Sequence, residues 1–445
     1  MHFKIILLLV FLAVLSPHKE CRGDEAPLTL NGCIKAAIEN NRAYLAEQEN
    51  TAAAKEGVGK AASGFLPKVD VSETYMRSDN PVAVFGAKLN QGRFTAADFA
   101  VKNLNDPPSI DNFNFRAQVT QPIFNGGKEW VGLKRAKLSA EASEMGLERV
   151  RQDLVYRVVQ DYYGVLLASE YCKVAEASVK DTEGHVQTAN KFFEQGMLLG
   201  SEVLSAKVHL AEAREMLVRA KNQLDTAKAG LNLVMARPQD TQVLIGQELE
   251  FQGFPGSLTE LQKEALDARP DLKGFALNVR NAEAGVTLAR TDYLPNLNFI
   301  ARYELDDKDI FRGSGDSYTL LGMVSWNIFD GLLTTYSVGE AKARHNSSRH
   351  MLEQMREGVL LEVRQSWNAV QEARERIEIS SASVKEAEES FRIIQRRFAT
   401  GLSKTIDVMD AETSLTRARM SRVQALYDYN TAVAAVKLSV GRMEY

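Results

Sequence analysis

The chain has 445 residues, and its charged residues nearly balance, with a formal net charge of −4 at neutral pH. Neither half is strongly basic, which excludes the extended positive surface of a nucleic-acid-binding protein. The 11 prolines are placed unevenly, because none lies between Pro122 and Pro238 and none follows Pro295. Since proline interrupts helices, these two stretches predict long helices.

The N-terminal segment predicts export from the cytoplasm. A lysine precedes an apolar run over residues 5–15, which is too short to cross a bilayer as a helix. We therefore expect residues 1–23 to be a cleaved secretory signal peptide. A lipid-anchored Cys21 is the alternative, although charged residues stand directly before it, where lipidation sites carry small ones. Export permits a disulfide between Cys33 and Cys172 without requiring one.

The chain that follows contains a tandem duplication. The segments "PIFNGG" and "NIFDGL" match at a spacing of 205 residues, which pairs Ile123, Phe124 and Gly126 with Ile328, Phe329 and Gly331. We interpret both segments as corners where a strand ends and a long helix begins. Upstream the spacing is 228, so the first copy is 23 residues longer before its corner. A duplication of this size predicts two like structural units, a first repeat over 24–237 and a second over 258–445, joined by a linker over 238–257.

Each repeat is predicted to begin with a helix followed by two strands. We place the strands at about residues 68–77 and 112–124 in the first repeat, and about 296–305 and 317–329 in the second. Aromatic and aliphatic side chains alternate with polar ones along these segments. This pattern is typical of membrane-barrel strands, and a half-buried soluble hairpin is the alternative. Residues 78–111, rich in Asn, Gly, Asp and Pro, are interpreted as a long extracellular loop.

Two long helices complete each repeat, at about 128–194 and 201–236 in the first and about 332–399 and 405–441 in the second. The return helix of the first repeat carries small and large apolar residues alternately at a 4-3 spacing: Ala206, Leu210, Ala213, Leu217, Ala220, Leu224, Ala227 and Leu231. This spacing predicts coiled-coil packing, with an amphipathic bundle helix as the alternative.

A tight turn is expected between the two long helices of each repeat. Gly196 and Gly401 are expected to stop the incoming helices. Ser201 and Thr405 are expected to cap the outgoing helices. Gly200 also belongs to the first turn.

Four membrane strands in one chain would leave open sheet edges in lipid, where each unpaired backbone group costs several kcal/mol. Closed bacterial barrels have even strand numbers of at least about eight, so a dimer or a trimer satisfies the rule. A larger ring leaves a water-filled interior. We therefore expect an oligomeric α+β membrane protein and favour a trimer, with a 12-stranded barrel and a twelve-helix tube.

These features together resemble the TolC family of outer-membrane efflux proteins. The resemblance is carried by "FLPKVDV" and "YLPNLNF", by the two corners, and by "TGLSKTIDVMDAET", and it spans nearly the whole exported chain. It implies a homotrimer whose four strands per chain form a 12-stranded β-barrel in the outer membrane of a Gram-negative-type bacterium. A long α-helical barrel continues from it into the periplasm.

The resemblance also implies the function. Such a duct belongs to a tripartite efflux or type I secretion system and passively conducts the substrates of an inner-membrane pump. The helix tips at Gly196, Gly200, Ser201, Gly401 and Thr405 would meet a periplasmic adaptor protein. In the family, paired aspartates ring the periplasmic entrance, and they match Asp407 and Asp410. Six such carboxylates in a trimer would attract cations. The alternative is that Asp407 serves its helix N-terminus.

The resemblance departs from the family at the closed-state latch. The counterparts of the two aspartates in the first repeat are Glu202 and Ser205. A family tyrosine falls on Phe398, which has no hydroxyl group, and a family arginine falls on Ser403. We predict that Lys404 contacts Glu202 as a substitute.

No catalytic constellation or cofactor motif is recognisable, so we expect neither enzyme activity nor a cofactor. His345 and His350 are five residues apart on a helix and do not predict a metal site. A soluble periplasmic coiled-coil adaptor and an adhesin-like structural protein are the competing interpretations. The adaptor explains the helical hairpins but neither the alternating strand pairs nor the duplication. The adhesin-like protein would not need an acidic tip.

Overall fold

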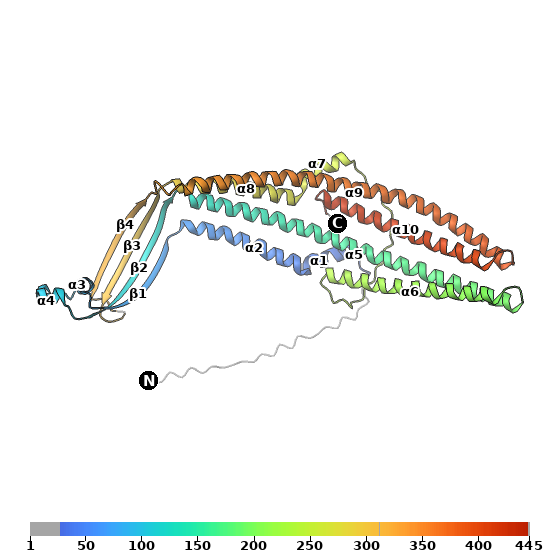
Figure 1. The fold of residues 1–445 in the computed structure, drawn as a ribbon, viewed down its shortest axis with the longest axis horizontal. Helices are drawn as coiled ribbons and strands as arrows, with labels where there is room; N and C mark the ends of the chain where they lie inside the picture. The colour runs from blue at the N-terminus through green and yellow to red at the C-terminus, as the bar shows by residue number, and fades with distance from the viewer. Residues whose placement is uncertain (1–26, 311, 444–445) are drawn as a thin grey trace, which may run out of the picture.

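The structure is a computed structural model that describes residues 27–310 and 312–443. The predicted signal peptide over residues 1–23 lies outside the described residues. The chain is elongated, with a four-stranded sheet at one end and two helical hairpins at the other (Figure 1). None of the helices in the described ranges is long and apolar enough to cross a membrane.

The strands of both repeats form one antiparallel sheet rather than two separate pairs. Its order is β1-β2-β3-β4, with bounds Lys68–Ser78, Ile110–Asn125, Asn296–Asp307 and Gly315–Ser325. Pairing between β2 and β3 joins the two repeats. Within residues 27–310 and 312–443, the outer strands β1 and β4 each have a strand neighbour on one side only.

The two faces of the sheet differ in polarity. One row across all four strands is apolar, formed by Val71, Ala117, Tyr303 and Tyr318. The next row is polar, formed by Ser72, Arg116, Glu304 and Ser317. Within it the Arg116 Nε atom lies 2.8 Å from the Glu304 carboxylate. The sheet therefore has one face suited to lipid and one suited to water.

At the first corner the expected strand-to-helix transition is present. Strand β2 includes Ile123 and Phe124, and helix α5 (Lys128–Glu194) begins three residues after the strand ends. Gly126 between them has a φ of 63°. A Cβ atom there would lie 2.5 Å from the carbonyl oxygen of Thr291, so the corner requires glycine.

The second corner differs from the expectation. Strand β4 ends at Ser325 rather than at residue 329, and Ile328 and Phe329 lie exposed between it and helix α9 (Leu333–Ala399), with Gly331 at a φ of 68°. The reason is pairing. Edge strand β4 pairs only with β3, which begins at Asn296 opposite Ser325, so no partner exists beyond that point.

The predicted loop over residues 78–111 is largely structured, which corrects that interpretation. It contains helix α3 (Pro81–Asn90), the 3-10 turn η2 (Ala96–Phe99) and helix α4 (Val101–Asn105). The Asn80 side chain caps α3 by accepting from two backbone N–H groups. The segment lies at the end of the sheet farthest from the hairpins (Figure 1).

The single helix expected at the start of each repeat is in fact two helices. The first repeat has α1 (Leu30–Asn40) and α2 (Arg42–Ala62), and the second has α7 (Leu258–Ala268) and α8 (Pro270–Arg290). The breaks fall at Asn41 and Arg269, which match at the spacing of 228. Both residues are non-helical, with ψ of 121° and 124°.

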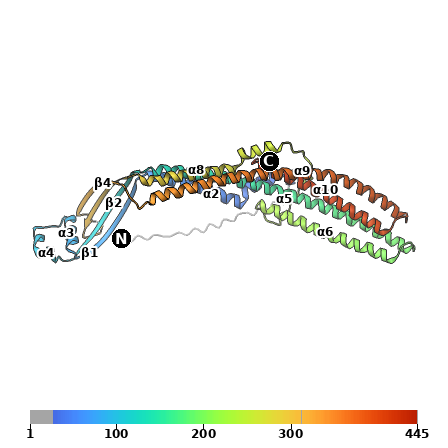
Figure 2. The ribbon, with the colours of Figure 1, turned by 45° about the horizontal axis from the view of Figure 1, so that its top comes forward.

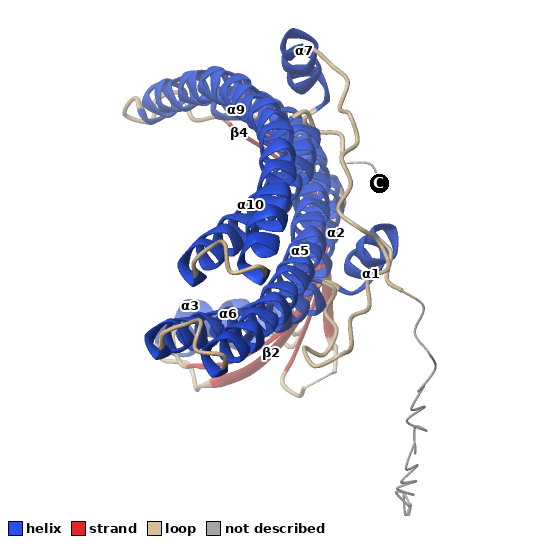
Figure 3. Cartoon of the chain, turned by 90° about the vertical axis from the view of Figure 1, so that its right-hand side faces the viewer, coloured by secondary structure: helices blue, strands red, loops and turns tan. Residues whose placement is uncertain are grey.

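The four long helices, together with α2 and α8, form one curved layer, and α1 and α7 lie against its outer side. In the half that carries the tips, the order of the helices is α6 (Gly200–Val234), α5, α10 (Thr405–Ser439) and α9. In the half near the sheet, the order is α2, α5, α8 and α9. Figure 2 shows that α5 and α9 run through both halves, and Figure 3 shows the curvature seen from the tips. One edge of the layer is thus α2 and α6, and the other is α9.

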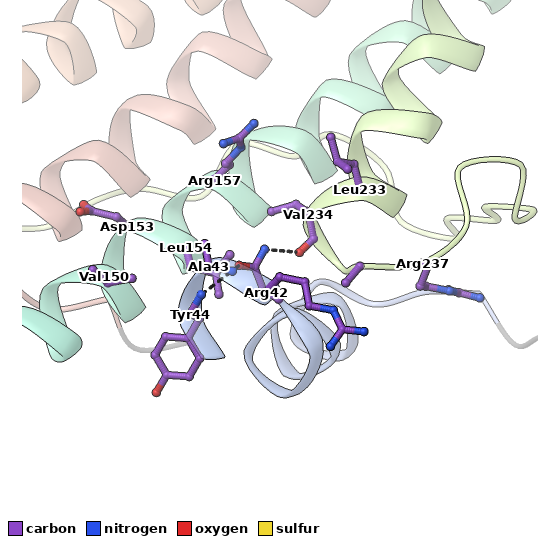
Figure 4. A pocket seen from close by; sticks show the side chains of 12 residues that line it. Arg42, Ala43, Tyr44, Val150, Asp153, Leu154, Arg157, Leu233, Val234 and Arg237 are labelled. Atoms are coloured by element: carbon purple, nitrogen blue, oxygen red, sulfur yellow. Dashed lines mark hydrogen bonds between the residues drawn. The ribbon is translucent and has the colours of Figure 1, made fainter. Parts of the chain in front are cut away.

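Asn41 holds α2 and α6 together end to end. Its side-chain oxygen accepts from the N–H groups of Ala43 and Tyr44, which caps α2. Its side-chain nitrogen donates to the carbonyl oxygen of Val234 at the end of α6, at 3.0 Å. A pocket of about 640 Å³ lies beside this joint, lined by residues at the start of α2 and the end of α6 and, from α5, by Val150, Asp153, Leu154 and Arg157 (Figure 4). One side chain therefore serves both helix ends.

Arg269 makes the corresponding link to the end of α10 in the second repeat, although its side chain does not cap α8. Its guanidinium is buried and donates to Asp271, to Glu362 on α9 and to the carbonyl oxygen of Ser439 at the end of α10. These charge-assisted bonds satisfy a cation that would otherwise be costly to bury.

We predict that Asn41→Ala lowers the stability of the helical layer. The variant loses a helix cap and a bond to α6, and loss of a cap costs about 0.5–2 kcal/mol. Thermal unfolding followed by circular dichroism measures the change. The control is Asn40→Ala, since the Asn40 amide bonds only within its own helix. Equal melting temperatures for the two variants would contradict the role of Asn41.

Candidate functional site

The tips of the two hairpins are built alike. The N–H of Met197 donates to the carbonyl oxygen of Phe192, and the N–H of Leu402 donates to that of Arg397, both at 2.8 Å. The residue before each of these donors is a glycine: Gly196 has a φ of 75° and Gly401 has a φ of 71°. This is the Schellman arrangement, in which a left-handed glycine ends a helix.

The predicted caps of the outgoing helices are wrong. Ser201 lies inside α6, which begins at Gly200 without a side-chain cap. Thr405 is the first residue of α10, and its buried hydroxyl has no hydrogen-bond partner among the described residues. In α10 the capping contact comes from Asp407 instead, whose carboxylate accepts from the N–H of Lys404 at 2.9 Å and from the Ser403 hydroxyl at 2.8 Å.

These bonds fix the charge of Asp407. The backbone N–H of Lys404 and then the Ser403 hydroxyl lower the pKa of its carboxyl group, because both donate to the ionised form. Asp407 therefore serves the N-terminus of α10 and remains a negative charge at the tip.

A groove of about 400 Å³ brings the two predicted ring residues together. It lies between α9 and α10 and is lined by Ala387, Ser390, Ile394, Arg397, Ser403, Asp407, Asp410, Ala411 and Ser414. Arg397 was not singled out from the sequence, and its charge contributes to the lowered pKa of Asp407. Glu202 and Ser205 lie on α6, in the other hairpin. No ion pair joins Glu202 to Lys404 within the described part of this single chain, so that contact stays a prediction.

Phe398 occupies an apolar contact between the hairpins. It is 3% exposed, and its ring centroid lies 5.8 Å from that of Phe192 on α5. Val203 of α6 and Val408 of α10 belong to the same buried cluster. Close to the tips the hairpins are thus joined by hydrophobic packing rather than by a tyrosine hydroxyl.

A buried polar cluster lies one to two helical turns farther from the tips than the apolar contact at Phe398, and it was not predicted from the sequence. Glu412 of α10 is 2% exposed and accepts from the hydroxyls of Ser178 at 3.1 Å and Thr182 at 2.5 Å on α5. Its second carboxylate oxygen lies 3.9 Å from His185 Nε2 and 3.7 Å from His209 Nε2. None of these three atoms makes a hydrogen bond within the described residues. The signal in the sequence was a glutamate beside the apolar seam of the second return helix.

The cluster favours a neutral His185. Burial lowers the pKa of this imidazole, whereas Glu412 and Asp181 act in the opposite direction and His209 lowers the pKa further. Across the described ranges, no group of three or more His, Cys, Asp or Glu side chains is placed to hold a metal ion. Cys33 and Cys172 are buried and unpaired, so the disulfide that export permits is not formed.

Comparison with known proteins decides the family. The sequence profile of the outer membrane efflux protein family matches residues 33–237 and 261–442. The chain belongs to this family. Its two matched segments correspond to the two repeats.

The relatives of this outer membrane efflux protein include both secretion and export proteins. Alkaline protease secretion protein AprF of Pseudomonas aeruginosa is 23% identical over 434 residues, covering 95% of this chain and 86% of the relative. Outer membrane protein TolC of Escherichia coli is 22% identical over 405 residues, covering 88% of this chain and 78% of TolC.

Solved channels share the fold. The CmeC outer membrane channel of Campylobacter jejuni superposes with a TM-score of 0.81 at 18% identity, covering 93% of this chain and 85% of that chain. VceC of Vibrio cholerae superposes with a TM-score of 0.77 at 15% identity, covering 93% and 97%. The predictions of the family, of the fold class and of an outer-membrane exit duct are confirmed, and the soluble-adaptor alternative is set aside.

We predict that acidification loosens the contact between the hairpins. The pKa of His185 is lower in the folded protein than in the unfolded chain, where a histidine has a pKa of about 6.5. The folded protein therefore binds this proton less readily. The unfolded chain therefore takes up more protons as the pH falls through about 6.5, and stability decreases. The melting temperature should fall between pH 7.5 and 5.5, and less so in His185→Gln. Exposed His350 provides the control variant His350→Gln. An unchanged pH dependence in His185→Gln would contradict the assignment.

Proposed function

We propose that three copies of this chain form one closed duct that conducts substrates passively through the outer membrane. The observation that carries the proposal is a two-faced sheet with both edges open, continuous with a curved helical layer whose edges are also open. In lipid, β1 and β4 must find strand partners, and neighbouring copies supply them. Three copies give twelve strands, enough for a water-filled interior.

The polar face of the sheet then lines the duct, and the apolar face contacts lipid. Arg116, Glu304 and Arg302 lie on the polar face and are held by hydrogen bonds to one another or to Gln118. Tyr318 and Leu320 on the opposite face are exposed in the single chain. Such charged groups are stable beside water and costly beside lipid.

The hairpin tips are proposed to meet a periplasmic adaptor protein that links the duct to an inner-membrane pump. Several large apolar side chains are exposed there in addition to the glycines of the turns: Met197, Leu199, Leu204, Leu402 and Ile406. Exposed apolar groups gathered at one end of a molecule are typical of a protein contact. One relative, AprF, is named for protease secretion, and another, OpmQ of Pseudomonas aeruginosa, is named for pyoverdine export. The pump rather than the duct would therefore select the cargo.

Asp407 and Asp410 are proposed to form an acidic ring at the periplasmic entrance. Three copies would place six carboxylates around one opening, which concentrates cations and repels anions. The groove that contains both side chains supports this proposal, because its lining extends to Arg397 and Ser403 beside the tip of the second hairpin.

Single-channel recording in planar bilayers tests the duct and its ring together. We expect a cation preference at neutral pH that is reduced several-fold in the Asp407→Asn/Asp410→Asn variant. The matched control is Asp267→Asn, an exposed aspartate on α7 away from the tips. Recovery of the protein in a detergent-free periplasmic extract would overturn the duct. A preference that survives in the double variant would overturn the ring alone.

A further inference from the structure

The two hairpins have the same fold but different neighbours in the single chain. On α5, Ser178, Thr182 and His185 are 7%, 1% and 7% exposed because α10 covers them. Their counterparts at the spacing of 205 are Ser383, Ala387 and Ser390 on α9. Both serines are exposed and Ala387 is half-buried, since none of the helices in the described residues covers this side of α9.

The groove between α9 and α10 is the open counterpart of the buried glutamate cluster. Of its lining residues, Ala387, Ser390 and Ser414 correspond to Thr182, His185 and His209. Small side chains therefore replace the two imidazoles and the threonine. Asp407 and Asp410 line the same groove, so its charge is negative apart from Arg397 at its tip end.

Glu412, which fills the groove between α5 and α6, has a positively charged counterpart in the first repeat. Glu412 of α10 fills the α5–α6 groove, and at the spacing of 205 it corresponds to Lys207 of α6. Lys207 is exposed and takes part in no ion pair given by the described residues of this chain. Glu412 thus lies in a groove lined by hydroxyl and imidazole groups of its own chain. Its counterpart Lys207 is exposed on α6, at one edge of the helical layer.

We propose that Lys207 of the neighbouring copy inserts into the α9–α10 groove and pairs with Asp410. This inference rests on the trimer of the proposed function. If the contact between hairpins of one chain is repeated between chains, α6 of one copy lies on α9 of the next. Lys207 then reaches the groove as Glu412 reaches its own. The charges are complementary, as an interface between copies requires.

The pairing explains how two carboxylates one helical turn apart are accommodated at the tip. Asp407 and Asp410 have the i, i+3 spacing at which like charges on a helix repel one another. A cation from the next chain relieves that repulsion and ties neighbouring hairpins together close to the entrance. While the pair holds, the attraction of cations at the entrance depends mainly on the three Asp407 carboxylates of the ring. Breaking the pair should therefore loosen the entrance and add the three Asp410 carboxylates to that attraction.

Site-specific crosslinking tests the contact directly in the full-length protein. The pair Lys207→Cys/Ser390→Cys is introduced with Cys33→Ala and Cys172→Ala, and intact membranes are treated with a short thiol-to-thiol crosslinker. We expect covalent dimers and trimers on a denaturing gel. The control pair, Lys207→Cys/Ser347→Cys, uses an exposed serine of α9 far from the tip and should stay monomeric. Trimers that form but do not crosslink through Ser390→Cys would overturn this inference and leave the proposed function standing.

A charge exchange adds a test that does not depend on cysteine. Lys207→Glu should lower the temperature at which the detergent-solubilised trimer dissociates, because three carboxylates per groove then repel. Lys207→Glu combined with Asp410→Lys should restore it. A double variant no more stable than Lys207→Glu would contradict the pairing. Absence of any trimer in the parent protein would overturn the proposed function as well.

Discussion

Backbone hydrogen bonding at the sheet edges is the constraint on which the rest of the structure depends. In the part of the chain that the structure describes, strands β1 and β4 each have one side without a strand neighbour, and lipid offers no substitute for the missing hydrogen bonds. The helical layer continues from the sheet and also has two open edges, formed by α2 and α6 on one side and by α9 on the other. One chain is therefore a segment of a tube. Its curvature, its two-faced sheet and its open edges are all consequences of closing that tube with further copies.

Much of this architecture follows from local sequence signals. The duplication, the strand alternation, the breaker-free helices and the glycine corner at Gly126 are all encoded within short stretches. Helix breaks at Asn41 and Arg269 were also readable, because Asn41 is a capping residue and Pro270 follows Arg269. They were missed because the apolar pattern on either side is continuous. In the segment predicted as a loop, Asn80 as a capping residue followed by Pro81 likewise indicated the start of helix α3.

Other features depend on partners distant in the sequence and could not be read locally. Strand β4 ends at Ser325 because β3 begins opposite it, whereas the matching β2 continues through a bulge. The buried cluster around Glu412 joins three helices, and neither histidine is close to it in sequence. The duplicated halves differ where their neighbours differ, since Glu412 faces a groove of the same chain and its counterpart Lys207 is exposed. Such divergence is what a duplicated unit needs in order to distinguish contacts within a chain from contacts between chains.

The central claim is that a single chain is incomplete and that three chains close one duct. Native mass spectrometry of the detergent-solubilised protein, with detergent removed in the gas phase, measures the number of copies directly. The account predicts one dominant species with the mass of three exported chains, and a loss of that species only on denaturation. A stable monomer or dimer under the same conditions would contradict it, because neither closes a sheet of this geometry around a water-filled path.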